Sequence, residues 1–313
     1  MIDQQVLTSL KQLFGSQLKE NASISAFCTA QTGGKADALL VASNRQELED
    51  ACMALWKESV PFRILGAGSN VLVSDQGFRG VIVINRAKAY RFDEETDQPT
   101  LWAESGANLG GLARQAAIHG FSGLEWAGTV PGTLGGAVYG NAGAHGGDMA
   151  GNLILADILH PDGKISSMDA NQMAYQYRSS ILKRDAEKAV ILSATLQLSR
   201  STRQQVTDLM TQYQEQRRRT QPPGASMGSM FKNPPGDYSG RLIEAAGLKG
   251  TRVGGVEISP IHANFFVNVG NATASDIYEL ICRARNAVHE RFGIQLELEI
   301  ELLGDFQAVH IND

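Results

Sequence analysis

The segment from residue 228 to residue 233 carries three side chains that can donate a proton or bind an anion. It places the hydroxyl of Ser229, the ammonium of Lys232 and the amide of Asn233 close together in the chain. No GxSxG pattern surrounds the serine, and none of the six histidines stands at a spacing that marks it as a base, so a hydrolase is disfavoured. Ser229 is either a proton donor or a loop serine bonded to its own backbone.

Two other segments carry charged side chains of types that are common in active sites. Arg178 has a planar guanidinium that suits a carboxylate, although a single arginine after a helix is commonly an exposed ion-pair partner. Near the C-terminus Glu297, Glu299 and Glu301 alternate with apolar residues, which predicts a half-buried strand with the three carboxylates on one face. Periodicity does not choose among these glutamates.

Glycine is concentrated in residues 122–151, which hold ten of the 33 glycines. Apolar residues stand between these glycines, which indicates an ordered segment in which the backbone can approach a ligand closely. A second glycine loop, residues 66–71, lies between two predicted strands, so it lacks the strand-turn-helix context of a Rossmann fingerprint. This loop is either a hairpin turn or a nest of N–H groups around an anion, and the two glycine segments together predict a nucleotide cofactor.

Composition limits the class of protein. A chain of 313 residues suits two or three domains, and a net charge of −5 argues against a nucleic-acid surface. The run Arg217 to Arg219 is expected to be a solvated helix end. Three cysteines without CxxC spacing predict reduced thiols and no metal site. Neither a signal peptide nor an apolar run of about 18 residues is found, so we expect a cytoplasmic protein without a membrane partner.

The elements that would position these residues indicate an α+β fold. Periodicity and capping residues predict helices over 6–18, 45–57, 108–119, 202–218, 239–246 and 273–292. Apolar runs predict strands at 61–65, 71–74, 81–84, 154–160, 190–198, 252–258, 263–269 and 294–303. Two prolines in residues 220–226 stop a helix and mark a domain boundary. We expect a first region, 1–219, with lobes of about 20–88 and 89–200, then a smaller α+β domain, 220–304, and a tail, 305–313.

The motifs in this order resemble those of the UDP-N-acetylenolpyruvoylglucosamine reductase (MurB) family. The similar segments are 32–37, 65–73 and 123–144 in the first region and 177–180, 228–234, 240–250 and 296–300 further on. The length resembles that of the shorter, type II branch. The resemblance implies an FAD-binding domain of the PCMH/vanillyl-alcohol-oxidase type followed by a smaller substrate-binding domain.

The resemblance also implies an activity, which is the reduction of UDP-N-acetyl-3-O-(1-carboxyvinyl)-glucosamine to UDP-N-acetylmuramate by NADPH through noncovalent FAD. Such an enzyme serves peptidoglycan synthesis, and with it cell wall biogenesis, cell shape and cell division. The implied catalytic residues are Arg178, Ser229 and Glu299, and the implied substrate contacts are Tyr177, Lys232, Asn233 and Asn264. The implied FAD contacts are Gly66, Ala67, Gly68, Ser69, Asn70, Val71, Thr129, Pro131, Gly132, Thr133, Gly135, Gly136, Asn141, Gly143 and Ala144.

Two alternatives stay open at this point. Besides this reductase, the chain is either another FAD oxidoreductase of the same fold or a noncatalytic nucleotide-binding protein. The sequence departs from the family pattern near the flavin at Phe27, Ala30, Gln31 and Lys35, and at Leu298, which replaces a proline. Around residues 219–220 the family often has a lysine near the substrate, and here that role is either vacant or filled by Arg219 or another residue.

Overall fold

The first lobe is built on a four-stranded sheet. The computed structural model describes residues 2–185 and 188–306, and in it the strand order of this sheet is β1-β2-β5-β3. Its strands are β1 (Leu18–Ser23), β2 (Lys35–Ala42), β5 (Phe78–Asn85) and β3 (Phe62–Leu65), of which β2, β5 and β3 run parallel. The sequence predicted β3 and β5 closely but neither β1 nor β2.

Two helices accompany this sheet. The first, α1 (Gln4–Phe14), ends four residues before the predicted Leu18, because Gly15 adopts a φ of 55° and Leu18 begins β1. The second, α2 (Arg45–Lys57), has the predicted bounds, and the side chain of Asn44 accepts from the N–H of Glu47 as a cap.

The second lobe is a five-stranded antiparallel sheet in the order β12-β11-β13-β7-β6. Its strands are β6 (Tyr90–Asp93), β7 (Thr100–Glu104), β11 (Leu153–Leu159), β12 (Ile165–Met168) and β13 (Val190–Gln197). The helix α2 packs between the lobes, since Leu48 and Cys52 share one core with Leu159 and Leu192 of this sheet. The two lobes are therefore held together by a common apolar core.

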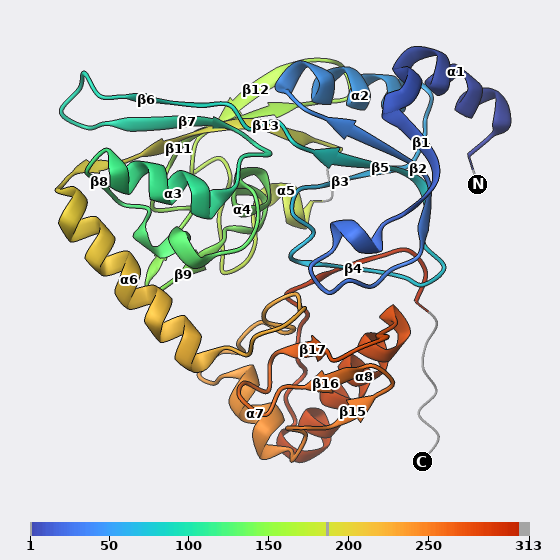
Figure 1. Cartoon of the computed structure of the whole chain (residues 1–313), viewed down its shortest axis with the longest axis vertical. Coiled ribbons are helices and arrows are strands. Elements are labelled where there is room, and N and C mark those ends of the chain that lie inside the picture. The colour runs from blue at the N-terminus through green and yellow to red at the C-terminus, as the bar shows by residue number, and fades with distance from the viewer. Residues whose placement is uncertain (1, 186–187, 307–313) are drawn as a thin grey trace.

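Helices and short elements cover the other face of the second sheet (Figure 1). They include α3 (Leu109–Ile118), the 3₁₀ turn η3 (Glu125–Thr129), α4 (Leu134–Gly140), the hairpin β9 (Gly143–Ala144) and β10 (Gly147–Asp148), and α5 (Ile181–Arg184). Short strands β8 (Phe121–Ser122) and β14 (Ser199–Arg200) pair beside them. The long helix α6 (Arg203–Thr220) then runs from the second lobe towards the C-terminal domain.

The C-terminal domain has its own apolar core between α7 (Ser239–Ala245) and α8 (Ala274–Phe292). The predicted strand 252–258 is instead a hairpin of β15 (Arg252–Val253) and β16 (Val256–Ile258), because Gly254, at a φ of 49°, turns the chain. A third strand, β17 (Phe266–Asn268), pairs with β16. Among the described residues, no helix is both long and apolar enough to cross a membrane.

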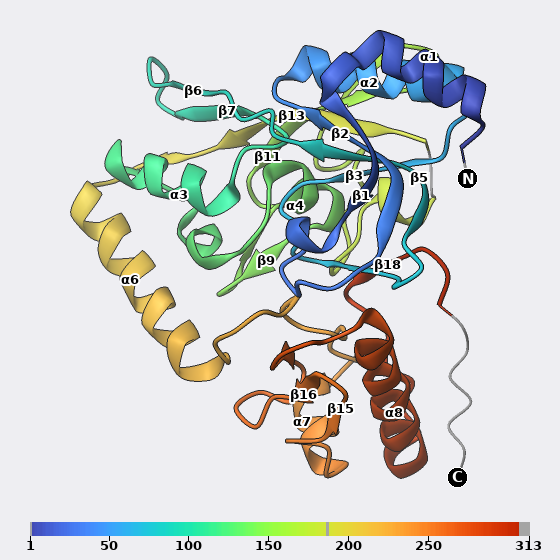
Figure 2. The same cartoon turned by 45° about the vertical axis from the view of Figure 1, so that its right-hand side comes forward.

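The chain returns from this domain to the first lobe at its end. The predicted strand 294–303 is wrong over most of its length, because only β18 (Glu301–Leu303) forms a ladder. It pairs in parallel with β4 (Val71–Val73), and Figure 2 shows it between the first lobe and the C-terminal domain. This return brings residues 297–301 next to the glycine loop that precedes β4.

Asp75 makes a second link between the first lobe and the C-terminal domain. Its carboxylate accepts from the backbone N–H groups of Ala274 and Ser275, both at 2.8 Å, at the beginning of α8. A carboxylate at this end of a helix satisfies free donors and interacts favourably with the helix dipole.

We predict that Asp75→Ala lowers the free energy of unfolding by about 1 kcal/mol, because two N–H groups of α8 lose their acceptor. Urea denaturation followed by circular dichroism measures the change. Asp50→Ala is the control, since Asp50 is exposed and, among the described residues, accepts a side-chain hydrogen bond only from Gln46 in the neighbouring turn of its own helix. Equal midpoints for the two variants would contradict the prediction.

Candidate active site

Glu299 lies where three distant segments of the chain meet. Its carboxylate accepts from Nε of Arg178 at 2.6 Å, and its backbone N–H donates to the carbonyl of Met230 at 3.0 Å. Its carbonyl accepts from the side chain of Asn70 at 3.0 Å. The side chains of Glu299 and Arg178 are 17% and 25% exposed, so water screens this ion pair only in part.

Arg178 stands at the tip of a tight turn. Gln176 and Ser179 exchange backbone hydrogen bonds of 3.0 and 3.1 Å, and Arg178 adopts a φ of 56°, which is uncommon for a residue with a Cβ. Buried Ser180 anchors the turn by donating to the carbonyl of Tyr139 at 2.6 Å. Such a strained conformation persists only where the surroundings fix it, and it is frequent at functional sites.

The segment that contains Ser229 is held between two others by backbone bonds. Ser229 bridges Phe265, and the N–H of Met230 donates to the carbonyl of Asn264 at 2.8 Å. On the other side the N–H of Lys232 donates to the carbonyl of Glu297 at 2.9 Å. The hydroxyl of half-buried Ser229 has no hydrogen bond to another described residue. Ser229 is thus one residue from the backbone partner of Glu299.

The three C-terminal glutamates are not equivalent, although the sequence predicted one shared face. Each pairs with a cation of a different segment: Glu297 with Lys232 at 3.3 Å, Glu299 with Arg178 at 2.6 Å, and Glu301 with Lys183 at 2.6 Å. Their side chains are 75%, 17% and 47% exposed, respectively. Glu299 is the most buried of the three, and it pairs with the arginine of the strained turn.

The loop from Gly66 to Asn70 fits a bound anion. Within the described parts of the chain, the backbone N–H groups of residues 67–70 have no acceptor. Polar groups of this kind need a partner, and consecutive N–H groups form a concave site for phosphate. Gly68 adopts a φ of 60°, and its carbonyl accepts from the N–H of Thr29 at 3.1 Å.

The second glycine segment lies against this loop. The hydroxyl of Ser69 donates to the carbonyl of Pro131 at 3.2 Å, and a Cβ on Gly66 would stand 2.2 Å from Oγ1 of Thr133. The buried Oγ1 of Thr129 has no partner among the described residues. These contacts bring the two predicted cofactor segments together at one site.

The glycines among the predicted FAD contacts fall into two groups by the space around them. A Cβ would clash with the protein itself, at less than 3.0 Å, at Gly66, Gly68, Gly135 and Gly143. For a Cβ on Gly132, which has a φ of 134°, the nearest atom would be Oγ of Ser69 at 3.2 Å. For a Cβ on Gly136 it would be Oγ1 of Thr133 at 3.7 Å. Among the predicted FAD contacts, Gly136 is thus the glycine beside which a Cβ would meet no close atom, and a Cβ on Gly132 would be tight only against a side-chain hydroxyl. The N–H of Gly135 already donates to the carbonyl of Ser105.

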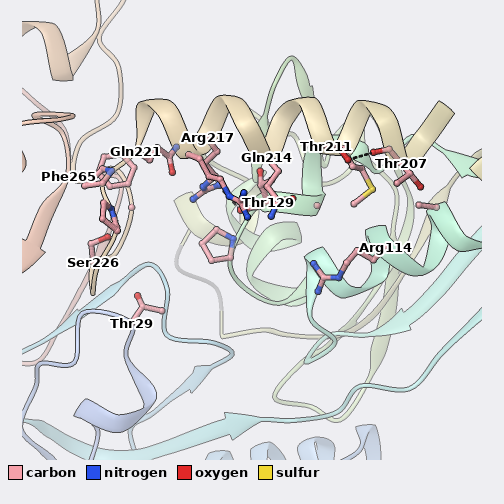
Figure 3. A pocket seen from close by; sticks show the side chains of 18 of the residues that line it. Thr29, Arg114, Thr129, Thr207, Thr211, Gln214, Arg217, Gln221, Ser226 and Phe265 are labelled. Carbon is pink, nitrogen blue, oxygen red and sulfur yellow. Dashed lines mark hydrogen bonds between the residues drawn. The ribbon is translucent and has the colours of Figure 1, made fainter. Parts of the chain in front are cut away.

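A cavity of about 950 Å³ opens beside these segments (Figure 3). Thr29, Thr129 and Pro131 line it on the side of the glycine loops, α6 covers the opposite wall, and Gly228 and Phe265 line the end near Ser229. The cavity therefore reaches from Thr29 and Pro131, which bond to the loop Gly66–Asn70, to Gly228, the residue before the candidate proton donor. The residues present fit a dinucleotide such as FAD.

Arg217 lies on the inner face of α6 and was missed as a site residue. Its guanidinium points towards η3 and donates to the carbonyl of Thr129 at 2.6 Å, as Figure 3 shows. Burial lowers its pKa. The expectation of a solvated helix end is wrong for this residue, whereas Arg219 is 80% exposed and stands 3.8 Å from Glu215. The signal in the sequence was the helical spacing of Thr207, Gln214 and Arg217, which all line the cavity.

Several predicted contact residues make bonds within the protein. Both ends of the amide of Asn264 bond to the backbone of Phe231, at 2.9 and 2.8 Å, and Asn264 is 2% exposed. The side chain of Asn233 accepts from the N–H of Ser239 at 3.1 Å. Asn141 donates to the carbonyl of Gln176 at 3.1 Å, which supports the arginine turn. Tyr177 is 52% exposed beside Arg178.

Two family models match this chain. The model of the UDP-N-acetylenolpyruvoylglucosamine reductase C-terminal domain matches residues 219–303, and a model of an FAD binding domain matches residues 36–169. Among curated relatives, the UDP-N-acetylenolpyruvoylglucosamine reductase of Chloroflexus aggregans is 41% identical over 94% of this chain and 100% of its own. The enzyme of that name from Bacillus subtilis is 36% identical over 96% of this chain and 99% of its own.

A solved structure is also similar. The UDP-N-acetylenolpyruvylglucosamine reductase (MurB) of Thermus caldophilus has a TM-score of 0.77 and 34% sequence identity, and the match covers 90% of this chain and 98% of that one. The α+β fold with an FAD-binding domain and a smaller C-terminal domain is confirmed by these matches. Identity above 30% over nearly the whole length means that the chain belongs to the UDP-N-acetylenolpyruvoylglucosamine reductase family.

Proposed function

We propose that this protein reduces UDP-N-acetyl-3-O-(1-carboxyvinyl)-glucosamine to UDP-N-acetylmuramate with NADPH through noncovalent FAD, as a step of peptidoglycan precursor synthesis. The ion pair of Arg178 and Glu299 beside the glycine loop carries this proposal, because it places groups suited to an enolate next to a dinucleotide site. The cytoplasm is the proposed location, since NADPH and UDP-activated sugars are cytoplasmic metabolites.

When bound, FAD would supply the hydride chemistry that links NADPH to the enolpyruvyl group. The free N–H groups of residues 67–70 and the backbone at Gly132 are the proposed contacts of its diphosphate. Arg217, which lines the same cavity without a carboxylate partner among the described residues, is the proposed replacement for the lysine that the family often has at residues 219–220.

Arg178 is the proposed electrostatic stabiliser of the substrate. Within the described chain it donates to a carboxylate only through Nε, so both of its Nη groups can face the substrate carboxylate as negative charge develops there. Glu299 holds the guanidinium in place. Because the pair is held before the reaction begins, little reorganisation is needed at the moment of charge transfer.

Ser229 is the proposed donor of the proton to the α-carbon of the enolate. Its hydroxyl has no competing hydrogen bond to the described residues, and its backbone is fixed against Phe265. Tyr177 and Lys232 remain proposed substrate contacts. The bonds of Asn233 and Asn264 favour a supporting role for these two residues.

Anaerobic absorption spectroscopy tests the proposed function. The purified protein is expected to carry FAD, to lose its flavin absorbance on addition of NADPH, and to regain it on addition of the enolpyruvyl UDP-sugar. Reoxidation only by oxygen or by another acceptor would favour a different FAD oxidoreductase, and a colourless protein without FAD would contradict the proposal. UDP-N-acetylglucosamine, which lacks the enolpyruvyl group, is the control ligand.

Ser229→Ala is expected to separate the two half-reactions. Reduction of the bound flavin by NADPH needs no acid at this position, so its rate should stay near that of the wild type. Reoxidation by the UDP-sugar should slow by about 10²- to 10⁴-fold, the usual loss for a positioned general acid. Stopped-flow absorbance measures both rates, with Ser9→Ala as the control, since Ser9 is an exposed serine of α1 that bonds to the preceding turn of its own helix. A slow reductive half-reaction in Ser229→Ala would contradict the proton-donor role.

Glu299→Gln is expected to slow reoxidation by about 10²- to 10³-fold, because the guanidinium of Arg178 loses its charged partner and its orientation. Glu297→Gln is the matched control, since Glu297 is 75% exposed and pairs with a lysine through a longer contact. That variant should change the rate less than about 3-fold, as exposed ion pairs contribute little. Similar losses of rate in both variants would show that Glu299 contributes no more to reoxidation than Glu297.

A further inference from the structure

A second ion pair runs beside that of Arg178 and Glu299 and joins the same two segments. Nζ of Lys183 lies 2.6 Å from Oε1 of Glu301. Lys183 belongs to α5, which directly follows the arginine turn, and Glu301 is two residues beyond Glu299. Two cations of one short segment therefore bind two carboxylates of another, although the segments are more than a hundred residues apart in the chain.

The burial of the two partners is unequal. The side chain of Lys183 is 17% exposed, whereas that of Glu301 is 47% exposed and also lies near Tyr139. A mostly buried ammonium depends on its carboxylate, because water cannot replace it fully. The half-exposed carboxylate depends less on the ammonium. The ion pair of Lys183 and Glu301 therefore connects the segment of residues 299–301 to α5.

The backbone beyond this pair is fixed as well. The N–H of Glu301 donates to the carbonyl of Asn70 at 2.9 Å, while Asn70 donates through its side chain to Glu299. Glu301 is the first residue of β18 and pairs with Val71, whereas residues 299 and 300 precede this ladder. The strand pairing fixes the backbone from Glu301 onwards, and the carboxylate of Glu299 is placed relative to Arg178 by the contacts of the residues that precede the ladder and by the side-chain ion pairs.

We propose that Lys183 is a positioning residue for the reduction of the UDP-sugar, acting through its ion pair with Glu301 to hold the carboxylate of Glu299 against Arg178. It touches neither substrate nor flavin in this role. The inference rests on the proposed function, in which Arg178 and Glu299 act on the substrate and not on the reduction of the flavin by NADPH.

Lys183→Met tests this inference. Methionine keeps the length and the apolar stem, and the half-exposed Glu301 becomes hydrated, so the variant should fold and keep its FAD. Reoxidation by the UDP-sugar should slow by about 10-fold, since small displacements of reacting groups cost that much or more. Flavin reduction by NADPH should be unchanged, and Lys183→Arg should recover most of the lost rate.

Lys249→Met is the matched control. Lys249 is also largely buried, at 29% exposure, and pairs with a half-exposed glutamate, Glu244, at 2.8 Å, but in the C-terminal domain outside the site. Removing it should leave both half-reactions within about 2-fold of the wild type, because it changes only a remote ion pair. An equal loss in Lys249→Met would show a general effect of lost ion pairs and would overturn the inference.

A double-mutant cycle with Glu299 separates positioning from mere stability. In a Glu299→Gln background, Lys183→Met should slow reoxidation by less than about 2-fold, because the carboxylate that it positions is already gone. Additive losses, or equal slowing of both half-reactions in Lys183→Met, would overturn the inference.

If the wild-type protein is not reoxidised by the UDP-sugar at all, the proposed function itself fails. If the wild type reacts and Lys183→Met equals it, only the positioning role fails.

Discussion

The return of the C-terminal segment to the first lobe is the constraint on which the site depends. Parallel pairing of β18 with β4 brings residues 297–301 out of the C-terminal domain and beside the loop that ends at Asn70. Glu299 then meets Arg178, from which it is separated by 121 positions in the sequence. Without this crossing, the arginine turn, the anion loop and the Ser229 segment would belong to separate parts of the molecule.

The arginine turn shows how local strain is maintained by such long-range contacts. The left-handed conformation of Arg178 is unfavourable for a residue with a Cβ, and no regular element enforces it. Ser180, Asn141 and the ion pair with Glu299 fix it from three sides. The guanidinium is therefore preorganised, which is the property that an enolate-stabilising group needs.

Glycine has two roles in the cofactor segments, and they need different reasoning. Gly66 and Gly68 are required because their own chain lies within 3.0 Å of the position that a Cβ would take. These contacts hold the two glycine segments together and so shape the anion loop. At Gly132 and Gly136 a Cβ would meet no backbone atom within 4 Å, so their role as FAD contacts is the one proposed above.

The sequence alone determined the family, the α+β class and the helices with clear caps, such as α2 after Asn44, because local propensity and motif order suffice for these. Alternation indicated Glu297, Glu299 and Glu301 only as a set, since it carries no information about partners, and only the motif resemblance pointed to Glu299. The tertiary structure distinguished them, because burial and the cations of distant segments differ at each position. The inward position of Arg217 and the pairing of β18 with β4 were likewise decided by packing between elements far apart in the chain, which no local pattern encodes.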